Sequence, residues 1–130
     1  MRSTQIPFLY ISESPLGGRG VFTSKAIHIN DLIEICPVII LSNEDTRKIH
    51  DTHLHDYYFV WSLEEKTSAI ALGYGSIYNH SANPNAAFNI EAESETIKIN
   101  ASKDIEAGGE VTLDYIGLKD ADIKLWFVPR

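Results

Sequence analysis

The sequence predicts a mostly-β fold with one or two short helices. Short runs of branched and aromatic residues recur along the chain, and turn residues such as glycine, proline and asparagine close each run. Segments with helical periodicity are few. A chain of 130 residues is large enough for one core but leaves little room for a second. We therefore expect residues 1–130 to form a single domain of short strands.

Several strands are expected, and the longest covers residues 32–41. Pro37 lies within this run and indicates an edge strand or a bend. Residues 86–91 and 95–101 are expected to form a hairpin, because apolar and polar side chains alternate in the second segment. The other expected strands, in chain order, are residues 6–11, 20–27, 54–61, 67–72 and 111–115.

Two helices are expected, and both are short. Ser42 is followed three residues later by Asp45, which is typical of a capping box and predicts a helix over residues 46–50. A second helix is expected shortly before Pro129, which would end it. Its apolar face would consist of Ile123, Trp126 and Phe127.

Two stretches of the sequence resemble each other, residues 25–33 and residues 103–111. Each contains a lysine, an isoleucine, a turn residue that tolerates positive φ, and then an apolar strand start. The turn residues are Asn30 and Gly108. We therefore expect two strands to begin through similar β-corners.

The balance of charges limits the classes of partner. Eleven basic and eighteen acidic residues give a net charge of −7. This argues against nucleic acid, whose binding depends on neutralised phosphates. An acidic surface can attract a basic peptide, although a negative charge also serves solubility alone. No apolar run approaches the roughly 20 residues that span a bilayer, and no signal peptide is visible, so we expect no membrane association.

Cys36 is the single cysteine of the chain. An intrachain disulfide and a cysteine-rich zinc cluster are therefore both excluded, and we expect a metal-free protein. The simplest expectation for the location is the cytoplasm.

Three segments contain residue types that are common in binding and catalytic sites. Residues 17–22 place three glycines within four positions, which lets a backbone approach a ligand, although a tight turn is the simpler interpretation. Residues 79–85 collect asparagine, histidine and serine side chains, which indicate either a ligand site or an asparagine-rich turn. Residues 108–115 end a strand on an acid and Tyr115, where a packed tyrosine is the simpler interpretation.

Taken together and in this order, the three segments resemble the SET domain family. That family begins with a glycine-rich turn like residues 18–22. It continues with an asparagine-histidine-serine motif followed by proline-asparagine, as in residues 79–85, and closes with a strand that ends in tyrosine, as in residues 110–115. The resemblance covers about residues 9–117, which leaves 118–130 as a C-terminal tail or lid.

The chain resembles in particular the compact viral and microbial SET proteins, which lack zinc-binding flanking segments. The similarity includes the serine-proline-leucine-glycine-glycine run of residues 14–18 and the aspartate-tyrosine-x-phenylalanine run of residues 56–59. It also includes the leucine-glycine-aromatic-glycine run of residues 72–75. Tyr78 stands where phenylalanine is common in the family, and we expect this difference to be harmless.

The resemblance implies a SET-domain β-clip with a threaded, pseudoknot-like C-terminal segment. It implies an enzyme that transfers a methyl group from S-adenosylmethionine to the ε-amine of lysine in a basic protein, histone-like or other. An alternative is a catalytically silent SET-fold module that only binds peptides. A further alternative is a small β-clip domain that binds sugars or metabolites. If the substrate is chromatin, the location would be the nucleoid or nucleus.

The resemblance also implies roles for individual residues. The cofactor would be bound by Gly18, Arg19, Gly20, Asn79 and His80. The catalytic residues would be Tyr115 and Tyr57, and the substrate channel would be lined by Tyr57, Leu113 and Tyr115. Because Leu113 has no hydroxyl to hold a water in the channel, di- or trimethylation is expected to be possible.

Other features are expected to be of less importance for function. The histidines and aspartates of residues 50–56 could suggest a metal site, but their spacing fits no ligand signature, and a coincidental solvated cluster is the better interpretation. Trp61 is expected in the core. The resemblance to compact relatives implies a possible homodimer, with Trp126 or Phe127 packed over the cofactor site or into the partner subunit.

Overall fold

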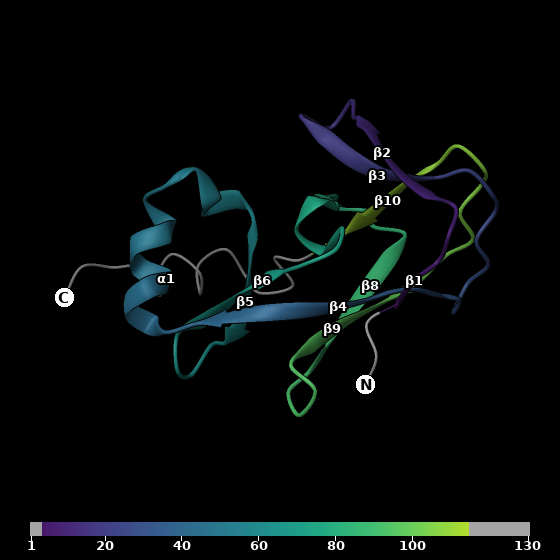
Figure 1. Ribbon diagram of the computed structural model, residues 1–130. Helices are drawn as coiled ribbons and strands as arrows, with labels where there is room; N and C mark the ends of the chain where they lie inside the picture. The colour runs from purple at the N-terminus through teal and green to yellow at the C-terminus, as the bar shows by residue number, and fades with distance from the viewer. Residues whose placement is uncertain (1–3, 115–130) are drawn as a thin grey trace.

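The computed structural model describes residues 4–114, which fold into two β-sheets, one α-helix and two 3₁₀-helices (Figure 1). Strands predominate, which confirms the predicted mostly-β class. The strands are β1 (Thr4–Gln5), β2 (Leu9–Glu13), β3 (Arg19–Thr23), β4 (Leu32–Leu41), β5 (Tyr58–Ser62), β6 (Thr67–Ala71), β7 (Asn79–His80), β8 (Ala86–Glu91), β9 (Thr96–Ala101) and β10 (Glu110–Leu113). The helices are α1 (Asn43–His50), η1 (His53–Asp56) and η2 (Gly75–Ile77).

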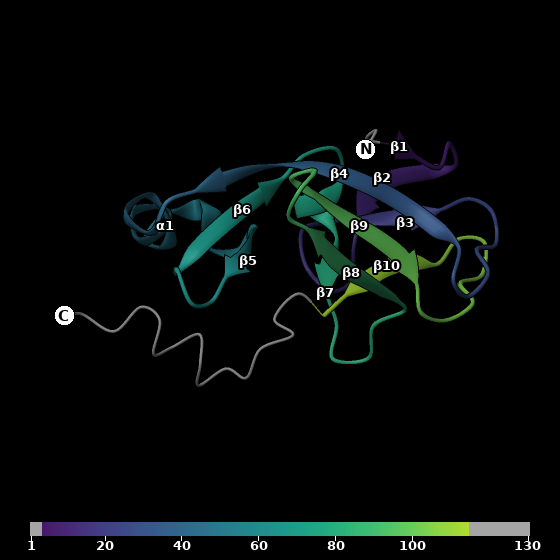
Figure 2. The ribbon, with the colours of Figure 1, turned by 90° about the horizontal axis from the view of Figure 1, so that it is seen from below.

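The larger sheet has six strands and is built around β4. Its order is β5-β6-β4-β9-β8, and β1 also pairs with β4. The first part of β4, up to Pro37, pairs with β9, and the part from Val38 to Leu41 pairs with β6. Pro37 therefore marks a change of partner inside the sheet and not an edge, as Figure 2 shows for the long strand β4.

The smaller sheet has four strands in the order β2-β3-β10-β7. β10 pairs antiparallel with β3 and parallel with β7, so the last described strand lies between segments from much earlier in the chain. In the parallel ladder Thr112 is paired with Asn79, and Leu113 with His80. This arrangement brings the glycine-rich turn before β3 close to the asparagine-histidine motif of β7.

The two predicted β-corners are present and pair with each other. Asn30 has a φ of 74° and Gly108 a φ of 86°, as expected for turn residues that tolerate the left-handed region. Ile27 and Ile105 form an antiparallel bridge in which each backbone N–H donates to the other carbonyl at 2.8 Å. The similarity between residues 25–33 and 103–111 thus corresponds to a contact in the structure.

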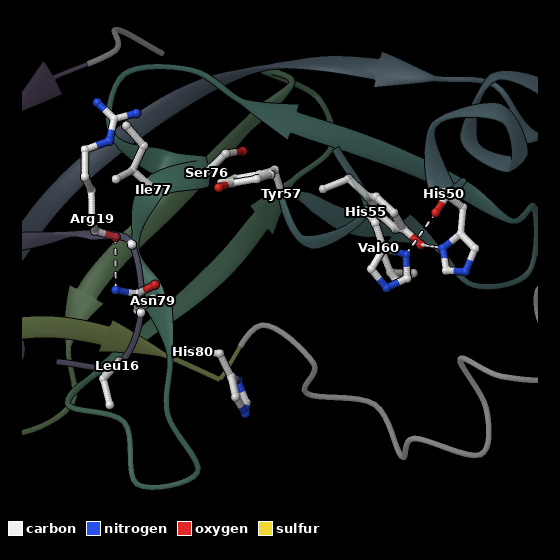
Figure 3. Close-up of a pocket in the computed structure, with 13 residues that line it drawn as sticks. Leu16, Arg19, His50, His55, Tyr57, Val60, Ser76, Ile77, Asn79 and His80 are labelled. Atoms are coloured by element: carbon white, nitrogen blue, oxygen red, sulfur yellow. Dashed lines mark hydrogen bonds between the residues drawn. The ribbon is translucent and has the colours of Figure 1, made fainter. Parts of the chain in front are cut away.

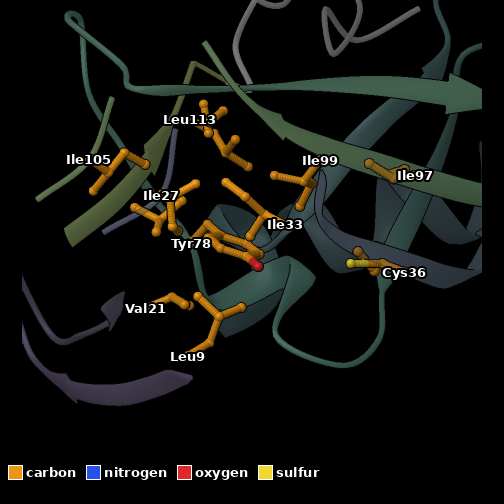
Figure 4. Packing of buried hydrophobic residues seen from close by; sticks show 14 of the residues in the cluster. Leu9, Val21, Ile27, Ile33, Cys36, Tyr78, Ile97, Ile99, Ile105 and Leu113 are labelled. Atoms are coloured by element: carbon orange, nitrogen blue, oxygen red, sulfur yellow. The ribbon is translucent and has the colours of Figure 1, made fainter. Parts of the chain in front are cut away.

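The hydrophobic core lies between the two sheets (Figure 4). Tyr78 and Phe59 are its largest fully buried side chains. Trp61 is partly buried and packs against the core, in agreement with the prediction for it. The branched and aromatic residues that predict strands thus bury their apolar side chains between the sheets. The fully buried aliphatic residues of this cluster are Val21, Ile27, Ile33, Ile97, Ile99, Val111 and Leu113.

Ser42 caps helix α1 as predicted, but the helix begins at Asn43, three residues before the expected start. The Ser42 side chain accepts a hydrogen bond from the backbone N–H of Asp45, which satisfies one of the donors at the helix start. The helix is attached to β6 through buried Thr46, whose hydroxyl lies 2.7 Å from that of Ser68. Within residues 4–114, no helix has the length and apolar content to cross a membrane.

The expected strands 32–41 and 86–91 coincide with β4 and β8. The prediction for residues 54–61 is wrong in its first half, because Thr52 caps the 3₁₀-helix η1 and the strand begins only at Tyr58. The expected strand 20–27 ends at Thr23, since the following turn leaves only the Ile27 bridge. The expected helix around Trp126 lies outside the described residues.

Candidate active site

A pocket of about 500 Å³ opens where three segments that are distant in the sequence meet (Figure 3). One side is the glycine-rich turn before β3, a second is η2 with β7, and a third is the region from the end of α1 to β5. The lining residues are Leu16, Gly17, Gly18, Arg19, His50, His55, Tyr57, Tyr58, Val60, Ser76, Ile77, Asn79 and His80.

The glycine-rich side depends on backbone conformations that suit glycine. Gly17 has a φ of 123° and Gly18 a φ of 57°. Ser14 closes the turn: its N–H donates to the Gly18 carbonyl at 2.9 Å, and its carbonyl accepts from the Gly17 N–H at 3.1 Å. The backbone of Gly17 and Gly18 is therefore exposed along the pocket, and Arg19 adds an exposed guanidinium.

Gly20 serves the site in another way, because it is buried and does not line the pocket. A Cβ atom at Gly20 would meet Glu110 Oε2 and, at 2.8 Å, Asn79 Nδ2. The missing side chain thus lets β3 approach the side chains of β7 and β10. Glu110 is a residue that the sequence motifs did not single out as part of the site.

Asn79 is held by hydrogen bonds to two neighbouring strands. Its amide nitrogen Nδ2 donates to the Arg19 carbonyl at 3.1 Å and to Glu110 Oε2 at 2.8 Å. Glu110 is itself fixed by Ser14, whose hydroxyl donates to Oε1 at 2.7 Å. The Asn79 oxygen Oδ1 accepts no hydrogen bond from residues 4–114 and is directed toward the pocket (Figure 3).

The second asparagine of the motif, Asn85, connects the same segment to β10. Its Nδ2 donates to the Glu110 carbonyl at 2.8 Å, and its Oδ1 accepts from the Thr112 N–H at 2.8 Å. The Asn85 side chain thus pairs with the backbone on both sides of Val111. The asparagine-rich segment is therefore a fixed structure in which both amide side chains are bound to β10.

The family model of the SET domain matches residues 18–116, which is most of the chain. This chain belongs to the SET domain family. Two similar proteins agree with that assignment. The Schizosaccharomyces pombe histone-lysine N-methyltransferase, H3 lysine-37 specific, is 32% identical over 108 residues, which cover 82% of this chain and 72% of that protein.

A crystal structure of a Plasmodium falciparum protein that is provisionally named a histone methyltransferase is similar to this SET domain. Its TM-score is 0.64 at 34% sequence identity, and the match covers 81% of this chain and 90% of that chain. The predicted family, β-clip fold class and enzyme class are confirmed by these comparisons.

The sequence-predicted site residues of this SET domain are only partly brought together. Gly18, Arg19, Asn79, His80 and Tyr57 line the same pocket. Tyr57 is 38% exposed, and its ring points across the pocket toward Ser76 and Ile77 (Figure 3). The imidazole Nδ1 of exposed His80 lies 3.5 Å from a carboxylate oxygen of Asp114.

The other predicted channel residues lie away from this pocket or outside the described part. Leu113 is fully buried in the hydrophobic core and does not line the pocket. Its role in a lysine channel stays a prediction, because Tyr115, which would form the channel with it, lies outside the described residues.

The wall opposite the glycine-rich turn contains residues that the sequence motifs missed. His50 Nδ1 lies 2.9 Å from the Tyr58 hydroxyl, and His55 Nδ1 lies 2.9 Å from the His50 carbonyl. The centroids of the two imidazole rings are 4.3 Å apart. The turn between α1 and η1 thus places two histidines of the 50–56 cluster, His50 and His55, on the pocket.

The strand pattern of β5 could have identified part of this wall. Phe59 is fully buried, whereas its neighbours Tyr58 and Val60 line the pocket, as expected for side chains that alternate along a strand. No comparable sequence pattern indicates that His50 and His55 lie on the pocket, because the two residues approach each other only where the chain reverses direction.

The electrostatics of this wall favour neutral side chains. Burial lowers the pKa of His50, neighbouring His55 lowers it further, and Asp51 has a smaller opposite effect. Burial also raises the pKa of the Tyr58 phenol. Within residues 4–114, no three histidine, cysteine, aspartate or glutamate side chains are placed to hold a metal ion.

Proposed function

We propose that this SET domain transfers a methyl group from S-adenosylmethionine to the ε-amine of a lysine in a basic protein. The observation that carries the proposal is the pocket in which Gly18 and Arg19 meet Asn79, His80 and Tyr57. These residues come from the segments that resemble the SET motifs. The S. pombe protein is named a histone-lysine methyltransferase and the P. falciparum protein is provisionally named a histone methyltransferase, which supports the same chemistry for this chain.

The groups on the pocket fit the cofactor. S-Adenosylmethionine, which would supply the methyl group on a positively charged sulfur, is of a size that a pocket of about 500 Å³ can hold. The exposed backbone of Gly17 and Gly18 allows close approach of a ligand. Arg19 suits the carboxylate of the cofactor, and Asn79 Oδ1 suits its ammonium group.

The lysine must reach the reaction as a neutral amine, because an ammonium ion has no lone pair. Removal from water lowers the pKa of a lysine, and so does a nearby positive charge. When bound, S-adenosylmethionine would supply the methyl group to the amine nitrogen and keep the electron pair of the broken carbon–sulfur bond, and Gly18, Arg19, Asn79 and His80 would hold it. The proton of the methylated amine is released to solvent, so the pocket mainly positions the reactants.

A core histone is the first substrate to test. The S. pombe protein is named for lysine 37 of histone H3, and the net charge of −7 on this chain suits a basic tail. With a histone substrate, the enzyme would act in the nucleus or nucleoid, and otherwise in the cytoplasm. We propose that the chain binds neither nucleic acid nor membrane directly. A homodimer would be recognised by a doubled mass in solution.

The test measures cofactor binding and methyl transfer side by side. S-Adenosylhomocysteine binding is followed by calorimetry, and transfer of a labelled methyl group is followed on purified histones. Asn79→Ala should weaken cofactor binding about tenfold or more, because the variant removes Oδ1 from the pocket and removes the Nδ2 donor from Glu110 Oε2. Asn89→Ala, at an exposed position of β8, is the matched control and should behave as the wild type.

Two outcomes would contradict the proposal. Cofactor binding without transfer to any basic protein would indicate the catalytically silent peptide-binding module. Absence of both binding and transfer would exclude a methyltransferase and favour a β-clip domain for other ligands.

A further inference from the structure

A buried acidic side chain lies on β4, outside the pocket. Glu34 is 2% exposed, and such a group is costly to bury unless it is hydrogen-bonded. Its carboxyl accepts from Gln5 Nε2 at 3.0 Å, from the Tyr74 N–H at 3.1 Å and from the Tyr78 hydroxyl at 2.6 Å. In all three bonds Glu34 is the acceptor.

Two of these bonds come from the segment that leads from β6 into β7. A Cβ atom at Gly73 would meet Glu34 Oε2, and one at Gly75 would approach Cys36 Sγ to 2.9 Å. Gly73 also has a φ of 65°, which disfavours any side chain there. The leucine-glycine-aromatic-glycine run of residues 72–75 is thus required for close contact between this segment and β4.

Tyr78 connects the buried carboxyl to the pocket. Its side chain is fully buried, and its hydroxyl bonds to a residue 44 positions earlier in the chain. Burial, and then the charge of Glu34, raise the pKa of Tyr78, so the phenol keeps the proton that it donates. The next residue is Asn79, so the bond from the Tyr78 hydroxyl anchors the residue that directly precedes the asparagine on the pocket.

We propose that Glu34 is a positioning residue for the cofactor side of the pocket. Through Tyr78 and the Tyr74 backbone it fixes the segment that presents Asn79 and His80. Glu34 touches no pocket-lining side chain through a hydrogen bond in residues 4–114, so it acts entirely through other residues. The inference rests on the proposed function for the identity of the ligand.

The test compares two variants that each remove one hydrogen bond from the same carboxyl. Tyr78→Phe removes the bond that leads to Asn79, and Gln5→Ala removes the bond from β1. Tyr78→Phe should raise the dissociation constant for S-adenosylhomocysteine about tenfold at a temperature well below unfolding. It should also accelerate amide hydrogen exchange over residues 79–81 in the protein without ligand.

Gln5→Ala should leave both readouts at the wild-type values even if it lowers the melting temperature. A purely structural role of Glu34 predicts lower melting temperatures for both variants and no difference in cofactor affinity or in exchange at residues 79–81. Either of these unchanged readouts in Tyr78→Phe would overturn the positioning role.

Glu34→Gln is a second variant, which decides the question if Tyr78→Phe does not fold. It keeps the volume but replaces one acceptor oxygen by a donor, and it should change affinity and exchange in the same direction. If the wild-type protein binds no cofactor, the proposed function fails, whereas the exchange measurement still decides whether Glu34 positions Asn79.

Discussion

The side chains of Asn79 and Glu110 are joined by a hydrogen bond of 2.8 Å between Nδ2 and Oε2. This bond connects β7 to β10 and passes directly over Gly20 of β3. Three strands therefore meet at one contact beside the pocket. The contact makes the geometry of this side of the pocket sensitive to small changes on any of the three strands.

Gly20→Ala tests this contact through a single added carbon. The new Cβ would meet Glu110 and Asn79, so we expect a destabilisation of about 1–3 kcal/mol and weaker cofactor binding. Gly108→Asn is the control, because open space surrounds Gly108 and asparagine tolerates positive φ. Urea unfolding and calorimetry measure the two effects. Wild-type affinity in Gly20→Ala would show that the strands adapt without loss.

Leu113→Ala should act mainly on stability. Leu113 is fully buried, and truncation of such a side chain costs about 2–5 kcal/mol. Leu72→Ala, at a side chain that is 41% exposed, should change the free energy of unfolding by no more than about 0.5 kcal/mol.

The absence of a hydroxyl at Leu113 predicts that the enzyme can add two or three methyl groups to one lysine. Mass spectrometry of the product measures this, and exclusive monomethylation by the wild type at exhaustive turnover would contradict it.

His50 predicts a pH dependence of stability. Because burial and His55 lower its pKa in the folded protein, the unfolded chain binds more protons in the range just below about pH 6.5, the ordinary pKa of histidine. The free energy of unfolding should therefore rise with pH through that range and level off above it. Denaturant unfolding at several pH values measures the slope, which should be smaller in His50→Gln. Equal slopes would show that His50 titrates normally.

Tyr115→Phe tests the catalytic role that the SET motif implies for a residue outside the described part. Loss of one oriented hydroxyl at the reacting groups should lower the rate by about 10² and leave cofactor affinity unchanged. Tyr10→Phe, at an exposed tyrosine of β2, serves as the control for the substitution itself. A rate within a factor of about two of the wild type would remove Tyr115 from the catalytic site.

Local alternation of apolar and polar residues predicts the hairpin strands well: β8 has the expected bounds, and β9 begins one residue after the expected start. The corner turns were also predictable, because Asn30 and Gly108 are residues that tolerate the required φ. The start of β5 was misplaced, since the aromatic residues that follow Thr52 read as strand while the cap at Thr52 favours a turn.

The sequence predicts the parts of the candidate site that lie within a single motif. It does not predict the parts that form through contacts between distant segments. Glycine and asparagine motifs located two sides of the pocket, but no local pattern joins His50 to His55 or Glu34 to Tyr78. The expectation that tyrosine at position 78 is harmless overlooked its hydroxyl, which has a buried acceptor 44 residues away. Such a partner is set by how β4 and the segment before β7 pack together.

The position of β10 between β3 and β7 has a consequence for synthesis of the protein. A nascent chain that has left the ribosome only as far as β9 contains the glycine-rich turn and the asparagine motif but lacks the strand that holds them side by side. Contacts of such large sequence separation form late and slow the folding of β-rich domains. The pocket is therefore assembled late, when β10 inserts between β3 and β7, which were made before it.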